Sequence, residues 1–176
     1  KQYFEIKKKH KDYILFYRLG DFYEMFYEDA KLVSRELELT LTGRDCGQQE
    51  RAPMCGVPFH SYEGYVARLV RKGYKVAICE QMEDPKTTKG LVKREIVRMI
   101  TPGTLIDASM LDENRNNFLA CVYCDNRAAA VCFADISTGE MFATACAERD
   151  ELYSELGRFL PREVLLGGAA CVDSAL

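Results

Sequence analysis

The feature that most constrains the fold is a change of hydrophobic period early in the chain. Residues 13–18 are rich in β-forming side chains, and the run ends at the turn signal Leu19-Gly20-Asp21. From Phe26 to Leu37 the apolar residues recur every three to four positions, which indicates an amphipathic helix. Strand-like and helical segments keep alternating further along the chain. The pattern therefore predicts an α/β (α+β) fold.

The remaining segments are assigned by the same criteria. Turns at residues 125–127 and 137–139 separate strand-like segments and predict an antiparallel meander. Ser61 is a candidate N-cap of a helix that Gly73 ends, and residues 43–56 are expected to form a polar loop. Other helices are expected over residues 1–13 and 148–160, and other strands over residues 38–42, 75–81, 92–100, 118–124, 129–136, 140–145 and 163–166.

The composition predicts a folded intracellular protein. The 176 residues are 48% hydrophobic and 29% charged, which is ordinary for a globular chain. No run approaches the roughly 20 apolar residues that a membrane-spanning helix needs, and no signal-peptide core follows the charged first residues. Because position 1 is not Met, we expect the sequence to begin inside a longer polypeptide.

A break in the pattern divides the chain in two. Thr101-Pro-Gly-Thr104 interrupts the strand-like segments, and a linker-like stretch follows it. We predict a first domain over residues 1–105, a linker over residues 106–115 and a second domain over residues 116–176. The second domain has only about 60 residues, which is small for an independent three-layer unit, so we expect it to be incomplete.

The two halves of the chain differ in charge. Residues 1–100 carry 19 Lys and Arg against 15 Asp and Glu, a net charge of +4, whereas residues 101–176 carry 5 against 12, a net charge of −7. Such asymmetry suggests that only the first half meets a polyanion. An ordinary solvated face explains +4 over 100 residues more simply, so charge alone does not assign nucleic-acid binding.

The cysteines are scattered through core-like sequence. Only Cys121 and Cys124 have C-x-x-C spacing, and no second pair follows them, which argues against a zinc site. We expect buried free thiols in a reducing compartment instead. The eight positions are Cys46, Cys55, Cys79, Cys121, Cys124, Cys132, Cys146 and Cys171.

Five ordered blocks of the sequence are more specific than any single short motif. Residues 16–30 (FYRLGDFYEMFYEDA) are similar almost residue for residue to the hallmark of the MutS mismatch-binding domain. In addition to the five blocks, Asp135-Ile-Ser-Thr-Gly139 looks like the early strand and turn of the connector domain of the MutS family. The resemblance covers essentially the whole chain. It implies a mixed-sheet mismatch-recognition domain followed by the first part of a ribonuclease-H-like connector domain. The other four blocks are PMCGVPFH at 53–60, VAICEQ at 76–81, Asp84-Pro85 with Lys89-Gly90, and VRMITPGT at 97–104.

The resemblance gives Phe22 and Glu24 their expected roles. They match the Phe-x-Glu signature of the family, so Phe22 is expected to enter the minor groove and stack on a mismatched base, to which Glu24 would hydrogen-bond. Unstacking a base step costs less at a mispair than in matched duplex. A charged Glu24 can only accept hydrogen bonds, whereas a protonated one, which we favour, could donate to a purine nitrogen. The alternative for Glu24 is a solvated acid in the first turn of a helix. We expect Tyr23 to pack instead of binding DNA.

Further DNA contacts are expected near this pair. Arg44 is a candidate phosphate contact, and Gly56 would permit close approach of the backbone to DNA. Met54 and His60 are expected beside Gly56, although His60 could equally stabilise a turn. Leu19 lies either near the groove or in the core.

The sequence contains no G-x-x-x-x-G-K-[ST] phosphate loop. We therefore expect no catalysis, cofactor or metal in this chain. The resemblance implies a longer, DNA-dependent ATPase that binds ATP and Mg, dimerises around mismatched double-stranded DNA and acts with a MutL-type protein. It further implies a cytoplasmic, bacterial-type location at the nucleoid and no membrane partner.

Two other classes stay open at this point. A paralogue could keep the fold and lose mismatch recognition, but the presence of both Phe22 and Glu24 argues against that. A metal or nuclease enzyme could use the cysteines or Asp135, but the spacing of the ligands makes this the weaker hypothesis. Asp135 is more simply a strand-end residue. Lys86 and Lys89 are expected to be ordinary solvated lysines.

Overall fold

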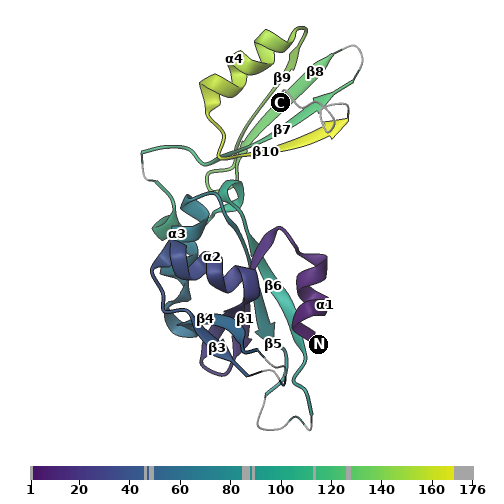
Figure 1. Cartoon of the computed structure of the whole chain (residues 1–176). Coiled ribbons are helices and arrows are strands. Elements are labelled where there is room, and N and C mark those ends of the chain that lie inside the picture. Colours follow the sequence, from purple (N-terminus) through teal and green to yellow (C-terminus); the bar gives the residue numbers. More distant parts are fainter. Residues whose placement is uncertain are drawn as a thin grey trace. The chain divides into compact units, whose positions relative to one another are not determined.

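The computed structural model describes residues 2–45, 47, 50–84, 88, 90–112, 114–125 and 128–168. The chain forms two compact units, Lys1–Ile100 and Thr101–Leu176 (Figure 1). Each contains one sheet with both parallel and antiparallel pairs, which confirms the predicted α/β fold class. The predicted boundaries at residues 105 and 116 stay a prediction.

The first unit is built on a six-stranded sheet of order β3-β4-β2-β1-β5-β6. β1 pairs with β2 in an antiparallel hairpin and with β5 in parallel. The strands are β1 (Tyr13–Leu19), β2 (Phe22–Phe26), β3 (Thr42–Arg44), β4 (Ala52–Pro58), β5 (Lys75–Gln81) and β6 (Arg94–Ile100). The helices are α1 (Gln2–Lys9), α2 (Tyr27–Leu37), the short 3₁₀ turn η1 (Phe59–Ser61) and α3 (Tyr62–Arg71).

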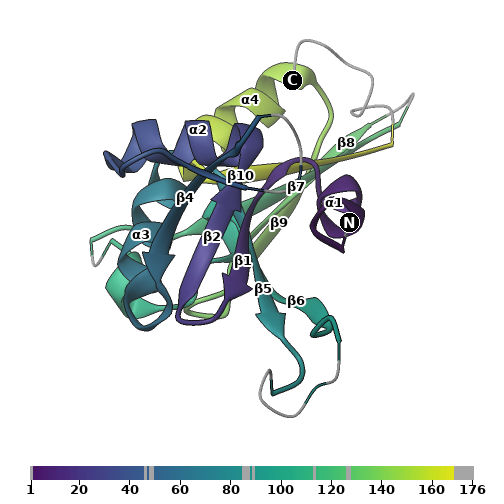
Figure 2. The ribbon, with the colours of Figure 1, turned by 60° about the horizontal axis from the view of Figure 1, so that its bottom comes forward.

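Helices lie on both faces of this sheet. α2 and α3 lie on one side and α1 on the other (Figure 2). The expected apolar stripe of α2 is buried, with Ala30 and Val33 fully inaccessible to solvent. Asp29 of α2 contacts both β1 and α1, because its carboxylate accepts hydrogen bonds from the Leu15 backbone N–H at 3.0 Å and from Lys7 Nζ at 2.9 Å. The first strand and both flanking helices are therefore joined at one buried carboxylate.

Several predicted elements of this unit are corrected. The strand expected at residues 38–42 is wrong, because α2 ends there with Glu38 in the left-handed conformation, at φ +58°. The loop expected over residues 43–56 is wrong too, because most of its second half is strand β4, which pairs with β2 and β3. Ser61 precedes α3 as predicted, but its hydroxyl donates to the Pro58 carbonyl instead of capping the helix.

The second unit contains a four-stranded sheet of order β10-β7-β8-β9. β7, β8 and β9 form the predicted antiparallel meander, and β10 adds to β7 in parallel. The unit consists of the 3₁₀ turns η2 (Pro102–Thr104) and η3 (Ala108–Met110), the strands β7 (Phe118–Cys124), β8 (Ala129–Asp135), β9 (Glu140–Cys146) and β10 (Glu163–Gly168), and the helix α4 (Arg149–Phe159).

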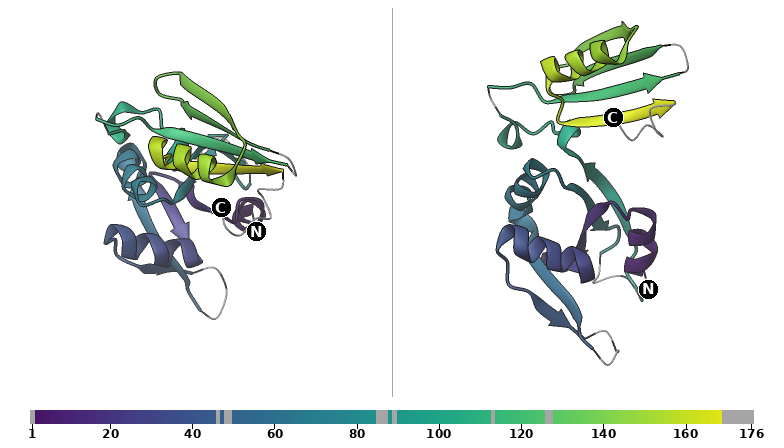
Figure 3. Two further views of the ribbon diagram at one scale, coloured as in Figure 1. Left: turned by 90° about the horizontal axis from the view of Figure 1, so that it is seen from above. Right: turned by 45° about the horizontal axis from the view of Figure 1, so that its top comes forward.

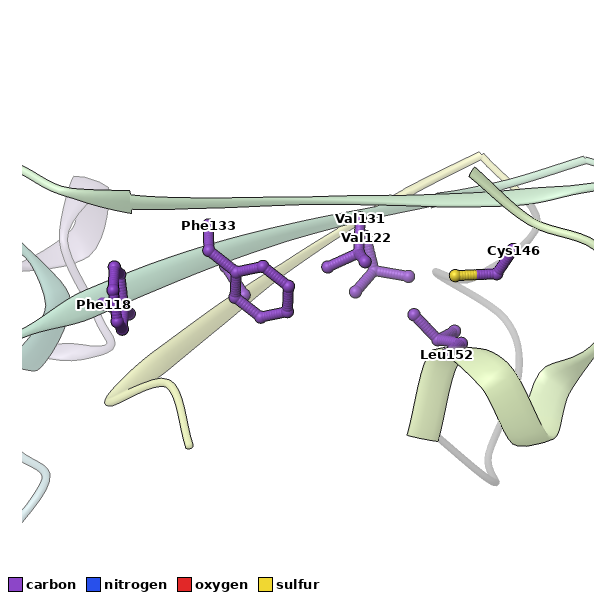
Figure 4. Packing of buried hydrophobic residues seen from close by; sticks show 7 residues of the cluster. Phe118, Val122, Val131, Phe133, Cys146 and Leu152 are labelled. Atoms are coloured by element: carbon purple, nitrogen blue, oxygen red, sulfur yellow. The ribbon is translucent and has the colours of Figure 1, made fainter. Parts of the chain in front are cut away.

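α4 covers one face of this second sheet and packs against β8 and β9 (Figure 3). The core between them contains Phe118, Val122, Val131, Phe133 and Leu152 (Figure 4). Phe133 and Phe159 stack with their ring centroids 4.2 Å apart. On the other face of the sheet η2 lies beside β7, where a Cβ at Gly103 would come within 2.9 Å of Leu119 Cδ1.

Asp135 is a strand-end residue, as predicted. Its carboxylate accepts hydrogen bonds from the backbone N–H groups of Asn117 and Ser137, at 2.8 and 2.9 Å, and from the Ser137 hydroxyl at 2.6 Å. Burial opposes ionisation, but these hydrogen bonds outweigh it and lower the pKa of Asp135 below its ordinary value. The carboxylate therefore holds the β8–β9 turn.

Two kinds of feature are absent from the described residues. No helix among them is long and apolar enough to cross a membrane. No cluster of three or more His, Cys, Asp or Glu side chains among them could hold a metal ion.

Candidate nucleic-acid interface

A two-residue turn presents Phe22 at the tip of the β1–β2 hairpin. Leu19 and Phe22 are register partners, so Gly20 and Asp21 form the whole loop. Gly20 has a φ of +59°. A positive φ at the first loop position is typical of the tight II′ hairpin turn, which favours glycine there. Phe22 therefore begins a strand immediately after a short, constrained turn.

The alternation of side chains along β2 separates the three residues of the Phe-x-Glu motif. Phe22 and Glu24 share one face of the sheet, and Tyr23 lies on the other. Phe22 is 48% exposed, whereas Tyr23 is 2% exposed, so Tyr23 packs as predicted. Glu24 lies within a strand, and the alternative of a first-turn helix acid is therefore wrong.

Helix α1 covers only part of the face that carries Phe22 and Glu24. The Tyr3 ring lies 5.1 Å from the Phe26 ring and 5.5 Å from the Tyr17 ring, measured between centroids. These contacts bury Phe26 at the far end of β2. Glu24, two residues closer to the hairpin turn than Phe26, is only half-buried. Phe22, which directly follows the turn, is exposed. The hairpin end of this face is therefore open to solvent.

Three hydrogen bonds fix the turn itself. The Gly20 backbone N–H donates to Gln81 Oε1 at 3.1 Å, and Arg18 Nε donates to the Gly20 carbonyl at 2.5 Å. The Phe59 backbone N–H donates to the Asp21 carbonyl at 3.0 Å. The guanidinium of Arg18 also lies 3.7 Å from the centroid of the Phe59 ring, a cation–π contact. β1, β5 and η1 thus hold the turn in one position.

A polar network supports the hairpin from the opposite face. The Tyr23 hydroxyl donates to Glu80, and Arg18 Nη1 lies 3.4 Å from Glu80 Oε1. Burial, followed by the hydrogen bond to the Glu80 carboxylate, raises the pKa of Tyr23 above its ordinary value. Sequence reasoning missed Arg18, Phe59, Glu80 and Gln81. Strand alternation places Arg18 and Tyr23 on one face, but only the pairing of β1 with β5 brings Glu80 to them.

Glu24 makes an ion pair with Arg44. Glu24 Oε2 and Arg44 Nη1 are in contact, with side-chain exposures of 16% for Glu24 and 44% for Arg44. Gly56 pairs with Glu24 across the sheet. A Cβ at Gly56 would lie 3.3 Å from the Tyr23 carbonyl oxygen and 3.5 Å from Glu24 Cγ. Glycine at position 56 therefore leaves the Glu24 side chain unobstructed.

The other predicted contacts lie at varying depths around this pair. Leu19 and Met54 are half-buried and pack against the cluster beneath α1. His60 is exposed, and its ring meets that of Phe59 edge to face with centroids 5.8 Å apart. The structure thus brings Phe22, Glu24, Arg44 and Gly56 onto adjacent strands, with His60 just beyond β4. Lys86 and Lys89 lie outside the described residues.

Comparison with known proteins assigns the family. The family model of MutS domain I matches residues 1–109, and that of MutS domain II matches residues 117–175. The chain belongs to the MutS family. The DNA mismatch repair protein MutS of Ruminiclostridium cellulolyticum is 54% identical over 99% of this chain, and that of Clostridium tetani is 56% identical over 94% of it. The chain spans 20% and 19% of the length of these two MutS relatives.

Proposed function

We propose that this chain recognises mismatched or unpaired bases in duplex DNA and so initiates mismatch repair, with Phe22 as the minor-groove wedge and Glu24 as its hydrogen-bonding companion. The observation that carries the proposal is the placement of Phe22. It is a half-exposed aromatic side chain at the tip of a fixed hairpin turn, and Glu24 lies on the same face of the same strand.

A wedge must resist displacement when it enters a base stack. Separating a base step costs a few kcal/mol in matched duplex and less at a mispair, where stacking and pairing are already weakened. A mobile loop would also lose conformational entropy on insertion. The hydrogen bonds that the turn makes with Arg18, Gln81 and Phe59 restrict it before DNA arrives. Because its backbone is fixed and its ring is exposed, Phe22 is suited to insertion into a base stack.

Arg44 gives the charge of Glu24 a partner in the free protein. A bare carboxylate at a DNA interface would repel the phosphates. Because Arg44 is the more exposed member of the pair, it can turn to a phosphate while Glu24 stays beside the groove. We propose this exchange of partners as the step that frees Glu24 for a mismatched base, where it either accepts a hydrogen bond or, when protonated, donates one.

The remaining roles concern the full-length protein. Because this sequence contains no phosphate loop, we propose that ATP and Mg bind outside this chain and that the chain itself carries out no catalysis. We also propose that the longer protein is a cytoplasmic, nucleoid-associated ATPase that dimerises on DNA and acts with a MutL-type partner. The names of its relatives, each a DNA mismatch repair protein MutS, support a role of the longer protein in mismatch repair.

The experiment compares binding of the full-length protein to G·T, unpaired-T and matched duplexes at fixed salt. Stacking of one base on an aromatic ring is worth about 1–3 kcal/mol, so Phe22→Ala is expected to weaken mismatch binding by about 5- to 150-fold. Phe4→Ala is the matched control, because Phe4 is 53% exposed on α1. An unchanged mismatch preference in Phe22→Ala would refute the wedge.

A further inference from the structure

Two cysteines of the second unit face each other on adjacent strands. Cys121 of β7 and Cys132 of β8 are direct register partners in an antiparallel pair. The next pair along the strands, Val122 and Val131, points towards α4 and the core (Figure 4). Because side chains alternate between faces, Cys121 and Cys132 lie on the opposite face of the sheet. Cys121 is exposed there and Cys132 is half-buried.

Both cysteines line one shallow hollow on this face, among mostly small side chains. Ala130, Ala143 and Ala145 line it with them, as does Tyr123, which lies two residues after Cys121 on β7. Ala143 is the partner of Cys132 on β9, so a methyl group occupies the position where a bulky residue would shield the thiol. A small reagent in solvent can therefore reach the pair.

The backbone holds the pair at a spacing that a disulfide can bridge. Partners in antiparallel strands have Cα atoms about 4.5 or 5.5 Å apart, and both values fall within the range of roughly 4.4–6.8 Å found in disulfides. The β7–β8 register runs without a bulge from Phe118 to Cys124. At its closed end, the Asp125 N–H donates to the Ala128 carbonyl at 3.0 Å. Neither strand has to move far for the sulfur atoms to meet.

The other described cysteines are poor candidates for forming a disulfide. Burial raises the pKa of Cys55 and of Cys79 to about 12, which keeps both as unreactive thiols at neutral pH. Cys146 is buried, and Cys124 packs against the core on the α4 side, opposite Ala129. The expectation of buried thiols thus holds for Cys55, Cys79 and Cys146 and is wrong for Cys121, whereas Cys46 and Cys171 lie outside the described residues.

We propose that Cys121 and Cys132 form a reversible dithiol–disulfide site that reacts with small-molecule disulfides. The Cys121 thiolate attacks one sulfur of the small disulfide, the S–S bond breaks, and one small thiolate leaves. The Cys132 thiolate then attacks the Cys121 sulfur of the mixed disulfide and expels the second small thiolate. Two protein thiols are oxidised, one small disulfide is reduced to two thiols, and the two cysteine protons pass through solvent to the leaving groups.

The test treats the 176-residue chain with excess oxidised glutathione at neutral pH. Mass spectrometry of the intact chain and of a non-reducing digest then identifies the products. Wild type is expected to lose the mass of two hydrogens through a Cys121–Cys132 cross-link, and dithiothreitol should reverse the change. Cys132→Ser is expected to stop at one glutathionyl group on Cys121. Cys124→Ser, three residues along the same strand, should cross-link as wild type does.

Three outcomes would overturn the proposal. The first is a glutathionyl group that persists on Cys121 in wild type without closing to Cys132. The second is a cross-link that needs Cys124, and the third is full alkylation of both thiols after glutathione treatment. Far-ultraviolet circular dichroism of each variant, compared with wild type, shows that the fold is retained. None of these measurements involves DNA, so the result is independent of the proposed mismatch recognition.

Discussion

Replacing Arg44 with Gln tests whether the proposed phosphate contact of Arg44 is separate from the proposed mismatch recognition. Arg44 is 44% exposed, and an ion pair with so exposed a member contributes less than about 1 kcal/mol to folding. We therefore expect Arg44→Gln to change the free energy of unfolding by less than that amount. On DNA, loss of one phosphate contact lowers the slope of log K against log salt by about 0.9.

The effect of Arg44→Gln should be the same on every duplex, because a phosphate contact carries no information about the bases. The assay is fluorescence anisotropy with matched and G·T duplexes at four salt concentrations. Arg35→Gln is the control, since Arg35 also pairs with a glutamate, Glu36, but on the α2 side of the sheet. Our reasoning is refuted if Arg44→Gln leaves the salt slope unchanged, or if it weakens G·T binding while matched binding stays the same.

Three further predictions concern stability, each measured by urea unfolding. Phe22→Ala should cost less than about 1 kcal/mol because the ring is half-exposed, whereas Met25→Ala, at 0% exposure, should cost about 2–5 kcal/mol; equal losses would mean that Phe22 is a core residue. Tyr23→Phe should cost about 1 kcal/mol through the lost hydrogen bond to Glu80. Because the pKa of Tyr23 is raised in the folded protein, the Tyr23 hydroxyl contributes fully to the free energy of unfolding below the ordinary pKa of 10.0, and this contribution is lost as pH rises above that value. If Tyr23→Phe lost stability at alkaline pH just as wild type does, this reasoning would be contradicted. Asp135→Asn should lower the free energy of unfolding by about 1–3 kcal/mol. Because the pKa of Asp135 is lowered in the folded protein, the carboxylate contributes to stability above its ordinary pKa of 3.8, and this contribution disappears as pH falls below that value. An Asp135→Asn chain as stable as wild type at neutral pH would argue against the role of Asp135 in the turn.

Local sequence signals predicted most elements whose hydrophobic period was clear. The strand at 75–81 has the predicted bounds, because its apolar run is closed by polar residues at both ends. The prediction of a strand over residues 38–42 was wrong, because its alternating residues directly follow the end of α2 at Leu37. The prediction of a loop over residues 43–56 was also wrong. Its Gly and Pro residues suggested a loop, but pairing with β2 makes residues 52–58 the strand β4.

In the candidate site too, local sequence signals predicted some features, whereas contacts between distant residues were missed. Phe22 and Glu24 could be named from a local motif, and alternation correctly predicted that Tyr23 packs on the other side. The ion pair of Glu24 with Arg44 joins residues 20 positions apart. The contact of Tyr23 with Glu80 joins residues 57 positions apart. Neither contact has a local signal, because each depends on which strands become neighbours in the sheet.

The most direct test of the central claim is photocross-linking with benzoylphenylalanine in place of Phe22, in the full-length protein bound to a G·T duplex. The wedge predicts cross-links within about one nucleotide of the mispair, because an inserted ring contacts the neighbouring base step. The same substitution at Phe4 should give none at the mispair. If position 22 cross-links matched and mismatched duplexes alike, or gives no cross-link, then Phe22 does not insert at the mismatch and the account is contradicted.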